Sequence, residues 1–201
     1  MARRAQPIPR FRVARGSPSC AWKKHAVPHT RIQPPILLEF PDGALGHYNA
    51  DPAMLFRLTQ RLLEELQRLR PDVLITWGPD GGYGHPDHRI VSSIVTQLVR
   101  AGAPGMPQRL FYASLPAEGI RAMNPTRGVP PFVMPQGSLF TMRVAFTPAD
   151  LDAGRRSMEC QKTQVSQEAV ERVVPAMRDV WKGEIPLSPM VPQSPANDLF
   201  R

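Results

Sequence analysis

A βαβ unit in the middle of the chain constrains the fold more than any other feature. Two apolar runs of strand length, VLITW at residues 73–77 and RLFYAS at residues 109–114, stand on either side of a segment with helical periodicity. A helix of roughly four turns between two apolar strands is typical of a βαβ unit with parallel strands. We therefore predict an α/β fold with a mostly parallel sheet, in which the 73–77 strand is buried on both faces.

Earlier in the chain, the sequence predicts a strand and a helix. The apolar run from Ile36 to Phe40 has the length of a short strand. After a loop with turn signals, leucines recur at helical spacing between Pro52 and Leu69. Asp51 is placed to cap this helix, and a proline in the first turn suits its start.

Later in the chain, the pattern predicts one more strand and two helices. The run LFTMRVAF at residues 139–146 reads as a strand, and the TPAD sequence after it opens a helix. Thr147 is placed to cap this helix, with Asp150 at the capping-box position. The last helix spans about residues 166–181 and contains Pro175, so we expect it to be kinked or broken there.

The excess of basic over acidic residues lies in the first part of the chain. The net charge is +8, and residues 1–34 hold eight basic residues and no acidic ones, so that 17 basic and 17 acidic residues remain elsewhere. We predict a disordered Pro/Arg-rich leader over residues 1–34, an α/β domain over 35–183 and an extended Pro-rich tail over 184–201. Because the body is neutral, we do not expect nucleic acid as a partner. A leader that binds nucleic acid and a tail that binds an aromatic groove stay open as alternatives.

The sequence also indicates the cellular compartment of the protein. Two cysteines form no disulfide scaffold, and no apolar run is long enough to span a bilayer. We therefore expect a cytoplasmic protein without a membrane partner. Whether the chain forms a homo-oligomer is left open.

The stretch GGYGHPDHRI, residues 81–90, contains the candidate catalytic and metal-binding residues. It lies between the 73–77 strand and the next helix, at the carboxyl end of a parallel strand, where open α/β sheets bind ligands. With Pro86 at the first helical position, His85 lies at the cap and His88 one turn later, so both can face one cleft. Neutral imidazole is a common zinc ligand, and charged imidazole donates to a developing oxyanion. The stretch therefore indicates a catalytic or metal site.

Two other interpretations of this stretch stay open. The glycines could cradle a phosphate, although no Lys-Ser/Thr pair follows them and their spacing does not fit the dinucleotide-binding pattern. Alternatively, His85 only caps the helix and His88 only packs against its neighbours.

Together with RPDVLITWGPD before it and EFPDGALG further upstream, GGYGHPDHRI resembles the PIG-L/LmbE-like zinc-dependent N-deacetylases, a family of N-acetylglucosaminyl deacetylase-like enzymes. The resemblance covers roughly residues 36–182. It implies a Rossmann-like three-layer α/β sandwich, a Zn²⁺ cofactor, and hydrolysis of an N-acetyl group from an amino sugar or a related small-molecule amine.

The resemblance also implies roles for single residues. His88 matches the zinc ligand, and His85 matches the histidine that stabilises the oxyanion of the tetrahedral intermediate. Asp87 matches the aspartate that tunes His85, and Tyr83 matches a mobile tyrosine that helps to polarise the carbonyl. The PDG loop further suggests that Asp42 contacts substrate.

The other half of the family's site has no counterpart here. Family members carry an HPDD motif after their first strand, which completes the metal site and supplies the general base, and this sequence contains no such motif. His25 and His29 are four residues apart, but Pro28 between them argues against a helical metal pair. We therefore expect a family member without its first βα unit, in which His88 is the one matching zinc ligand. A start-site or frame error is our hypothesis for the gap.

Two functional expectations follow. The first is a metal-dependent amide hydrolase that removes an N-acetyl group. The second is a truncated, catalytically inactive α/β binding module that keeps the substrate loops.

Overall fold

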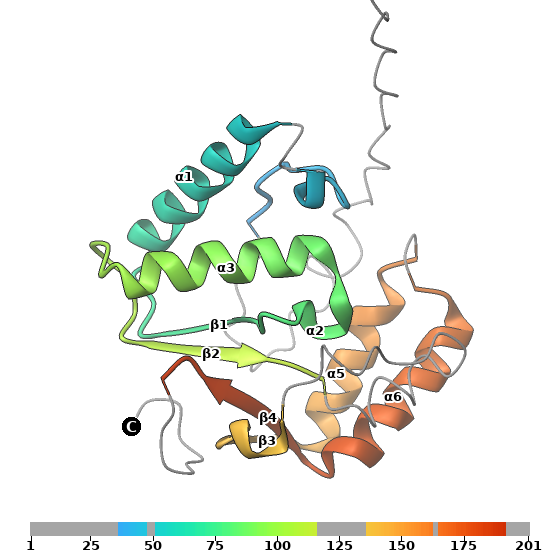
Figure 1. Ribbon diagram of the computed structural model, residues 1–201. Helices are drawn as coiled ribbons and strands as arrows, with labels where there is room; N and C mark the ends of the chain where they lie inside the picture. Colours follow the sequence, from blue (N-terminus) through green and yellow to red (C-terminus); the bar gives the residue numbers. More distant parts are fainter. Residues whose placement is uncertain (1–35, 48–50, 116–135, 163–164, 192–201) are drawn as a thin grey trace, which may run out of the picture.

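The computed structural model describes residues 36–47, 51–115, 136–162 and 165–191, and its ribbon is shown in Figure 1. Four strands form one sheet in the order β1 (Val73–Trp77), β2 (Arg109–Ala113), β4 (Glu184–Pro189) and β3 (Met142–Ala145). The strands β1 and β2 are parallel, with Val73 opposite Arg109 and Trp77 opposite Ala113. The helix α3 (Pro86–Arg100) connects them, which confirms the predicted βαβ unit.

The prediction of a mostly parallel sheet is wrong for the described strands. The strand β4 runs antiparallel to both of its neighbours, β2 and β3. The chain reaches β4 from the opposite direction because it enters directly from the helix α6 (Gln167–Trp181), without crossing back over the sheet. The fold is α/β as expected.

The predicted tail at residues 184–201 begins inside the sheet, so that boundary is wrong. Glu184–Pro189 is the strand β4, and Leu187 in its middle is only 3% exposed. Extended backbone suits both a polyproline segment and a strand, and here Leu187 packs with Phe111 and Met142 in a core cluster. The segments 1–34 and 192–201 lie outside the described residues.

One side of the sheet is covered by two helices. Figure 1 shows α3 lying over β1 and β2, with α1 (Pro52–Leu69) beyond it. A buried apolar cluster joins these helices and includes Leu58, Leu66, Ile94 and Leu98. The helix α1 begins as predicted, since the Asp51 carboxylate accepts a hydrogen bond from the Met54 amide at 3.1 Å. The Rossmann-like three-layer sandwich stays a prediction.

The predicted strand from Ile36 to Phe40 is not formed. This segment is irregular, and the side chains of Leu38 and Phe40 pack against the α1–α3 cluster instead of entering a sheet. The strand β1 pairs with β2 alone among the described residues. As a result Ile75 is 47% exposed, and the prediction that this strand is buried on both faces is wrong.

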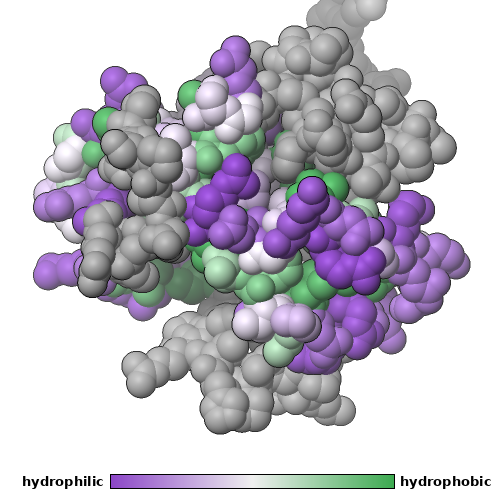
Figure 2. Space-filling model, turned by 90° about the horizontal axis from the view of Figure 1, so that it is seen from below, coloured by the Kyte–Doolittle hydropathy of each residue, from purple (hydrophilic) through white to green (hydrophobic). Residues whose placement is uncertain are grey.

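The C-terminal helices start where the sequence predicts. The helix α5 (Pro148–Glu159) carries a full capping box, in which Thr147 and Asp150 bond reciprocally. The helix α6 runs through Pro175 as one helical segment, so the predicted break is absent. Viewed from below, the molecule shows apolar side chains in green between hydrophilic ones in purple (Figure 2). No helix in the described part of the chain is long and apolar enough to cross a membrane.

Candidate active site

The loop after β1 is held in a conformation that requires glycine. The short helix α2 (Gly81–Gly84) follows Asp80, and Gly81 and Gly82 have φ of 72° and 76°. A Cβ on Gly82 would lie 2.6 Å from Cε3 of Trp77, and one on Gly81 would lie 2.9 Å from Cγ of Arg89. The two glycines thus let the backbone lie directly against the Trp77 ring and the first turn of α3.

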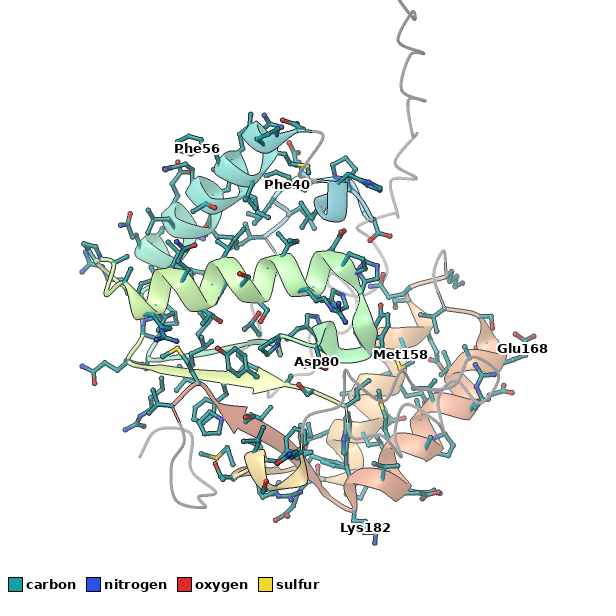
Figure 3. The ribbon with its side chains drawn as sticks, viewed as in Figure 1. Phe40, Phe56, Asp80, Met158, Glu168 and Lys182 are labelled. Atoms are coloured by element: carbon teal, nitrogen blue, oxygen red, sulfur yellow. The ribbon has the colours of Figure 1, made fainter. Side chains whose placement is uncertain are left out.

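Asp80 and Ser114 join the carboxyl ends of the two parallel strands. The Ser114 hydroxyl donates to Oδ1 of Asp80 at 2.9 Å, and Nε of Arg89 donates to the Asp80 backbone carbonyl at 3.1 Å. The other carboxylate oxygen, Oδ2, is buried without a hydrogen-bond partner. Figure 3 shows Asp80 where β1 passes into α2. This pair was not predicted from the sequence, although Asp80 closely follows the predicted 73–77 strand and Ser114 is the last residue of the predicted 109–114 strand.

His88 is fixed by a stack and a hydrogen bond. Its ring lies against the Trp77 indole with centroids 4.6 Å apart and planes 5° from parallel, and its Nδ1 lies 3.0 Å from the Gly81 carbonyl oxygen. Because a carbonyl only accepts, Nδ1 carries the proton and a neutral ring keeps its lone pair on Nε2. Burial lowers the pKa of His88, and nearby His85 acts in the same direction. The ring is therefore neutral near pH 7 and in the tautomer that suits a metal ligand.

Tyr83 and His85 complete a cluster of rings around His88. The His85 and His88 centroids are 4.7 Å apart, and the Tyr83 ring meets both imidazoles edge-on at 5.8 Å and 5.3 Å. His85 is the N-cap of α3, but its side chain makes no capping hydrogen bond, and its Nδ1 is buried without a partner. Tyr83 is 54% exposed. The His85 side chain therefore does not make the hydrogen bond that a purely capping role would require.

Asp87 faces a different part of the molecule. Its carboxylate is only 9% exposed and accepts hydrogen bonds from the backbone amides of Gly43, at 2.7 Å, and Gly46, at 3.3 Å. Both amides belong to the loop at residues 41–47, which carries Asp42 and ends in the 3-10 helix η1 (Leu45–His47). The predicted tuning of His85 by Asp87 stays a prediction.

The charge of Asp42 acts on Tyr83. Burial raises the pKa of Tyr83, and the negative charge of Asp42 raises it further. Three of the predicted site residues, Tyr83, His85 and His88, thus lie together as a cluster of rings. The other two, Asp42 and Asp87, are linked through the loop at residues 41–47, which carries Asp42 and binds the Asp87 carboxylate.

The described residues do not by themselves fit a zinc ion. Catalytic zinc sites use three protein ligands and keep one position open. Across the described ranges, no three His, Cys, Asp or Glu side chains lie close enough together to hold a metal ion. His88 offers one suitable nitrogen.

The fold and this cluster define an α/β protein whose candidate site lies at the carboxyl ends of parallel strands. Residues 23–99 match the family model described as PIG-L: GlcNAc-PI de-N-acetylase. This stretch, which includes the ring cluster and the 41–47 loop, is similar to the PIG-L family, and the resemblance seen in the sequence is confirmed.

Curated relatives of this chain share one name. The chain is similar to 1D-myo-inositol 2-acetamido-2-deoxy-alpha-D-glucopyranoside deacetylases from three bacteria. The Corynebacterium urealyticum protein is 34% identical over 119 residues, which are 53% of this chain and 36% of the relative. The Rhodococcus opacus protein is 32% identical over 139 residues, 59% of this chain and 46% of the relative. The Kineococcus radiotolerans protein is 30% identical over 155 residues, 64% of this chain and 41% of the relative. The chain thus spans less than half the length of each of these relatives.

Proposed function

We propose that this chain carries the histidine half of an N-deacetylase site, which hydrolyses the N-acetyl group of an amino sugar. The observation that carries the proposal is the fixed His88 ring, whose Nδ1 is bound to the Gly81 carbonyl and whose Nε2 is left free for a ligand. The shared name of the relatives supports a sugar acetamide linked to inositol as the substrate class.

The chain's own residues suit the oxyanion side of this reaction. Attack of water on an amide carbonyl places negative charge on its oxygen, and a fixed donor stabilises that charge. His85, with a buried Nδ1 free of hydrogen bonds, is our candidate donor, and the half-exposed Tyr83 hydroxyl is a second. The pKa of Tyr83 is raised, chiefly by burial, so its hydroxyl keeps its proton at neutral pH.

Among the described residues, His88 is the one that we propose as a zinc ligand. A bound zinc ion would polarise the amide and acidify a water molecule. The further ligands and the general base would have to come from outside the described residues, because those supply no three-ligand cluster. We also propose a cytoplasmic location, which the low cysteine content supports.

Acetate release by the full chain tests this function. The chain is incubated with Zn²⁺ and N-acetylglucosaminyl inositol, and acetate is measured for the wild type, His85→Ala, His88→Ala and His47→Ala. We expect His85→Ala to lower the rate by about 10²- to 10⁴-fold and His88→Ala to abolish it. His47 is exposed in the neighbouring loop, so its variant should match the wild type. Equal rates in all four proteins would refute the assignment.

A binding module is the second candidate, and the lack of a three-ligand cluster in the described ranges favours it. It predicts that the chain binds N-acetylglucosaminyl inositol at equilibrium but releases no acetate at any zinc concentration. Calorimetric titration of the wild type with this substrate, beside the acetate assay, separates the two functions.

A further inference from the structure

We propose that the open edge of β1 is a self-association surface, on which a second copy of this chain adds its own β1 in antiparallel orientation. The two sheets then join into one, with Ile75 of each copy on the two-fold axis. This inference concerns the edge of the sheet and does not depend on the proposed deacetylase function.

The outer edge of β1 has no partner strand in the part of the chain that the structure describes. On the inner edge, the Gly78 amide donates to the Ala113 carbonyl at the end of β2, at 3.2 Å. Because backbone groups alternate between the two edges of a strand, the N–H and C=O groups of Val73, Ile75 and Trp77 point away from β2. Figure 1 shows β1 as the terminal strand of the sheet, beneath α3. The edge therefore presents a row of donors and acceptors to a further strand.

This edge lacks the features that usually prevent strand pairing. Natural sheets protect their open edges with charged side chains, proline, bulges or very short strands. The strand β1 has five residues, VLITW, and contains no charge, no proline and no glycine. Ile75 in its middle is 47% exposed. Because branched and aromatic residues favour strands, this edge is suited to accept a partner.

The residues around β1 make the edge complementary to a second copy of itself. In an antiparallel pair centred on Ile75, Val73 of one copy lies opposite Trp77 of the other, and their outward groups bond reciprocally. The next outward positions are Pro71 and Pro79, each four residues from the centre. Neither proline has an N–H to donate, so the paired segment ends at both of them. The pairing is thus limited to β1 and is the same in both directions.

The side chains near the axis also suit a two-fold contact. Ile75 of one copy meets Ile75 of the other, which removes exposed apolar surface from water. Asp72 is the one charged residue between the two prolines, and it lies opposite Gly78, so no like charges meet. A two-fold axis relates strands that run in opposite directions, which matches antiparallel pairing.

The opposite edge of the sheet explains why association stops at two copies. The strand β3 is the other terminal strand, has only four residues and carries the exposed Arg143. A short strand with a charged side chain resists further pairing. The joined sheet therefore has a β3 at each end, and the contact is closed.

Sedimentation of the full chain over about a hundredfold range of concentration tests this surface. We expect the wild type to pass from one chain of 22.4 kDa to two chains as the concentration rises. Ile75→Lys and Ile75→Glu should each weaken the dimer at least about tenfold, because like charges then meet on the axis. An equimolar mixture of these two variants should dimerise again, since unlike charges meet.

Leu139→Lys is the matched control for these variants. Leu139 is also 47% exposed but lies in the 3-10 helix η3 (Gly137–Leu139), so its variant should dimerise like the wild type. A wild type that stays monomeric, or a dimer that survives in Ile75→Lys, would overturn the proposal. Failure of the mixture to dimerise would exclude pairing about Ile75. Assemblies larger than two chains would contradict the closed contact.

Hydrogen exchange in the wild type covers the case in which the charged variants do not fold. The amides of Val73, Ile75 and Trp77 should exchange at least about tenfold more slowly at high protein concentration than after dilution. The amides of Leu74 and Thr76 point toward β2 and should be protected at both concentrations. If the Ile75 amide exchanges equally at both, the proposal is wrong: slow exchange would assign the edge to another segment of the chain, and fast exchange would leave it uncovered. Dilution returns Ile75 to its exposed state, so the stability of the single chain is measured there.

Discussion

The ring of His88 lies flat against the indole of Trp77, with the centroids 4.6 Å apart and the planes 5° from parallel. The stack and the hydrogen bond to the Gly81 carbonyl fix the ring from two directions. The protein thus sets the orientation and tautomer of His88 by itself, before any ligand binds. This arrangement depends on the glycines that let the backbone approach Trp77.

Gly82→Ala should destabilise the protein by about 2–4 kcal/mol. The new methyl group would collide with the Trp77 ring, and alanine disfavours the positive φ at this position. Urea unfolding followed by tryptophan fluorescence gives the free energy. Gly154→Ala is the control, because its site in α5 is open and alanine favours helix, so it should be neutral or stabilising by up to about 1 kcal/mol. Equal stability of the two variants would contradict this account of the loop.

His88 should make the protein less stable as the pH falls. Burial lowers its pKa in the folded state below the ordinary value of 6.5, so the unfolded chain binds more protons between the two values. Stability is therefore complete above the unfolded pKa and is lost as the pH falls through the folded one. Unfolding free energies from about pH 8 to about pH 5 should show a shallower slope for His88→Gln than for the wild type. His47→Gln, at an exposed loop position, should keep the wild-type slope.

Two residues opposite each other in the sheet should respond differently to truncation. Ile75 on β1 pairs in register with Phe111 on β2, but Ile75 is 47% exposed and Phe111 only 2%. We expect Phe111→Ala to cost about 3–5 kcal/mol, and Ile75→Ala to cost about 1 kcal/mol or less. Chemical denaturation of both variants measures the difference. A large loss at Ile75 would mean that its exposed side is covered in the full chain.

The capping box of α5 should contribute measurably to stability. No residue of α5 is fully buried, so the helix depends on its cap and on ion pairs along its surface. Thr147→Ala removes the cap and should lower the unfolding free energy by about 1 kcal/mol. Ser157→Ala, at an exposed position in the same helix, should leave it unchanged or slightly raise it. The helical circular dichroism signal of both variants during thermal unfolding checks this difference.

The sequence by itself determined the features that depend on neighbouring residues. The caps at Asp51 and Thr147 follow local rules, because their hydrogen bonds join residues three positions apart. The elements of the βαβ unit and the start of α3 behind the glycine loop were read from local patterns of apolar residues, glycine and proline. The ring cluster of Tyr83, His85 and His88 was predictable for the same reason, since one turn brings these residues together.

Only the tertiary structure decided how distant segments meet. The strand β4, read from its prolines as a tail, enters the sheet between β2 and β3 because Leu187 buries against Phe111 and Met142. The Asp80–Ser114 hydrogen bond and the bonds from the Gly43 and Gly46 amides to Asp87 join residues 34 to 44 positions apart, where no sequence period connects the partners. These contacts depend on strand register and helix packing, which bring Asp80 to the Ser114 hydroxyl and the buried Asp87 carboxylate to two backbone amides.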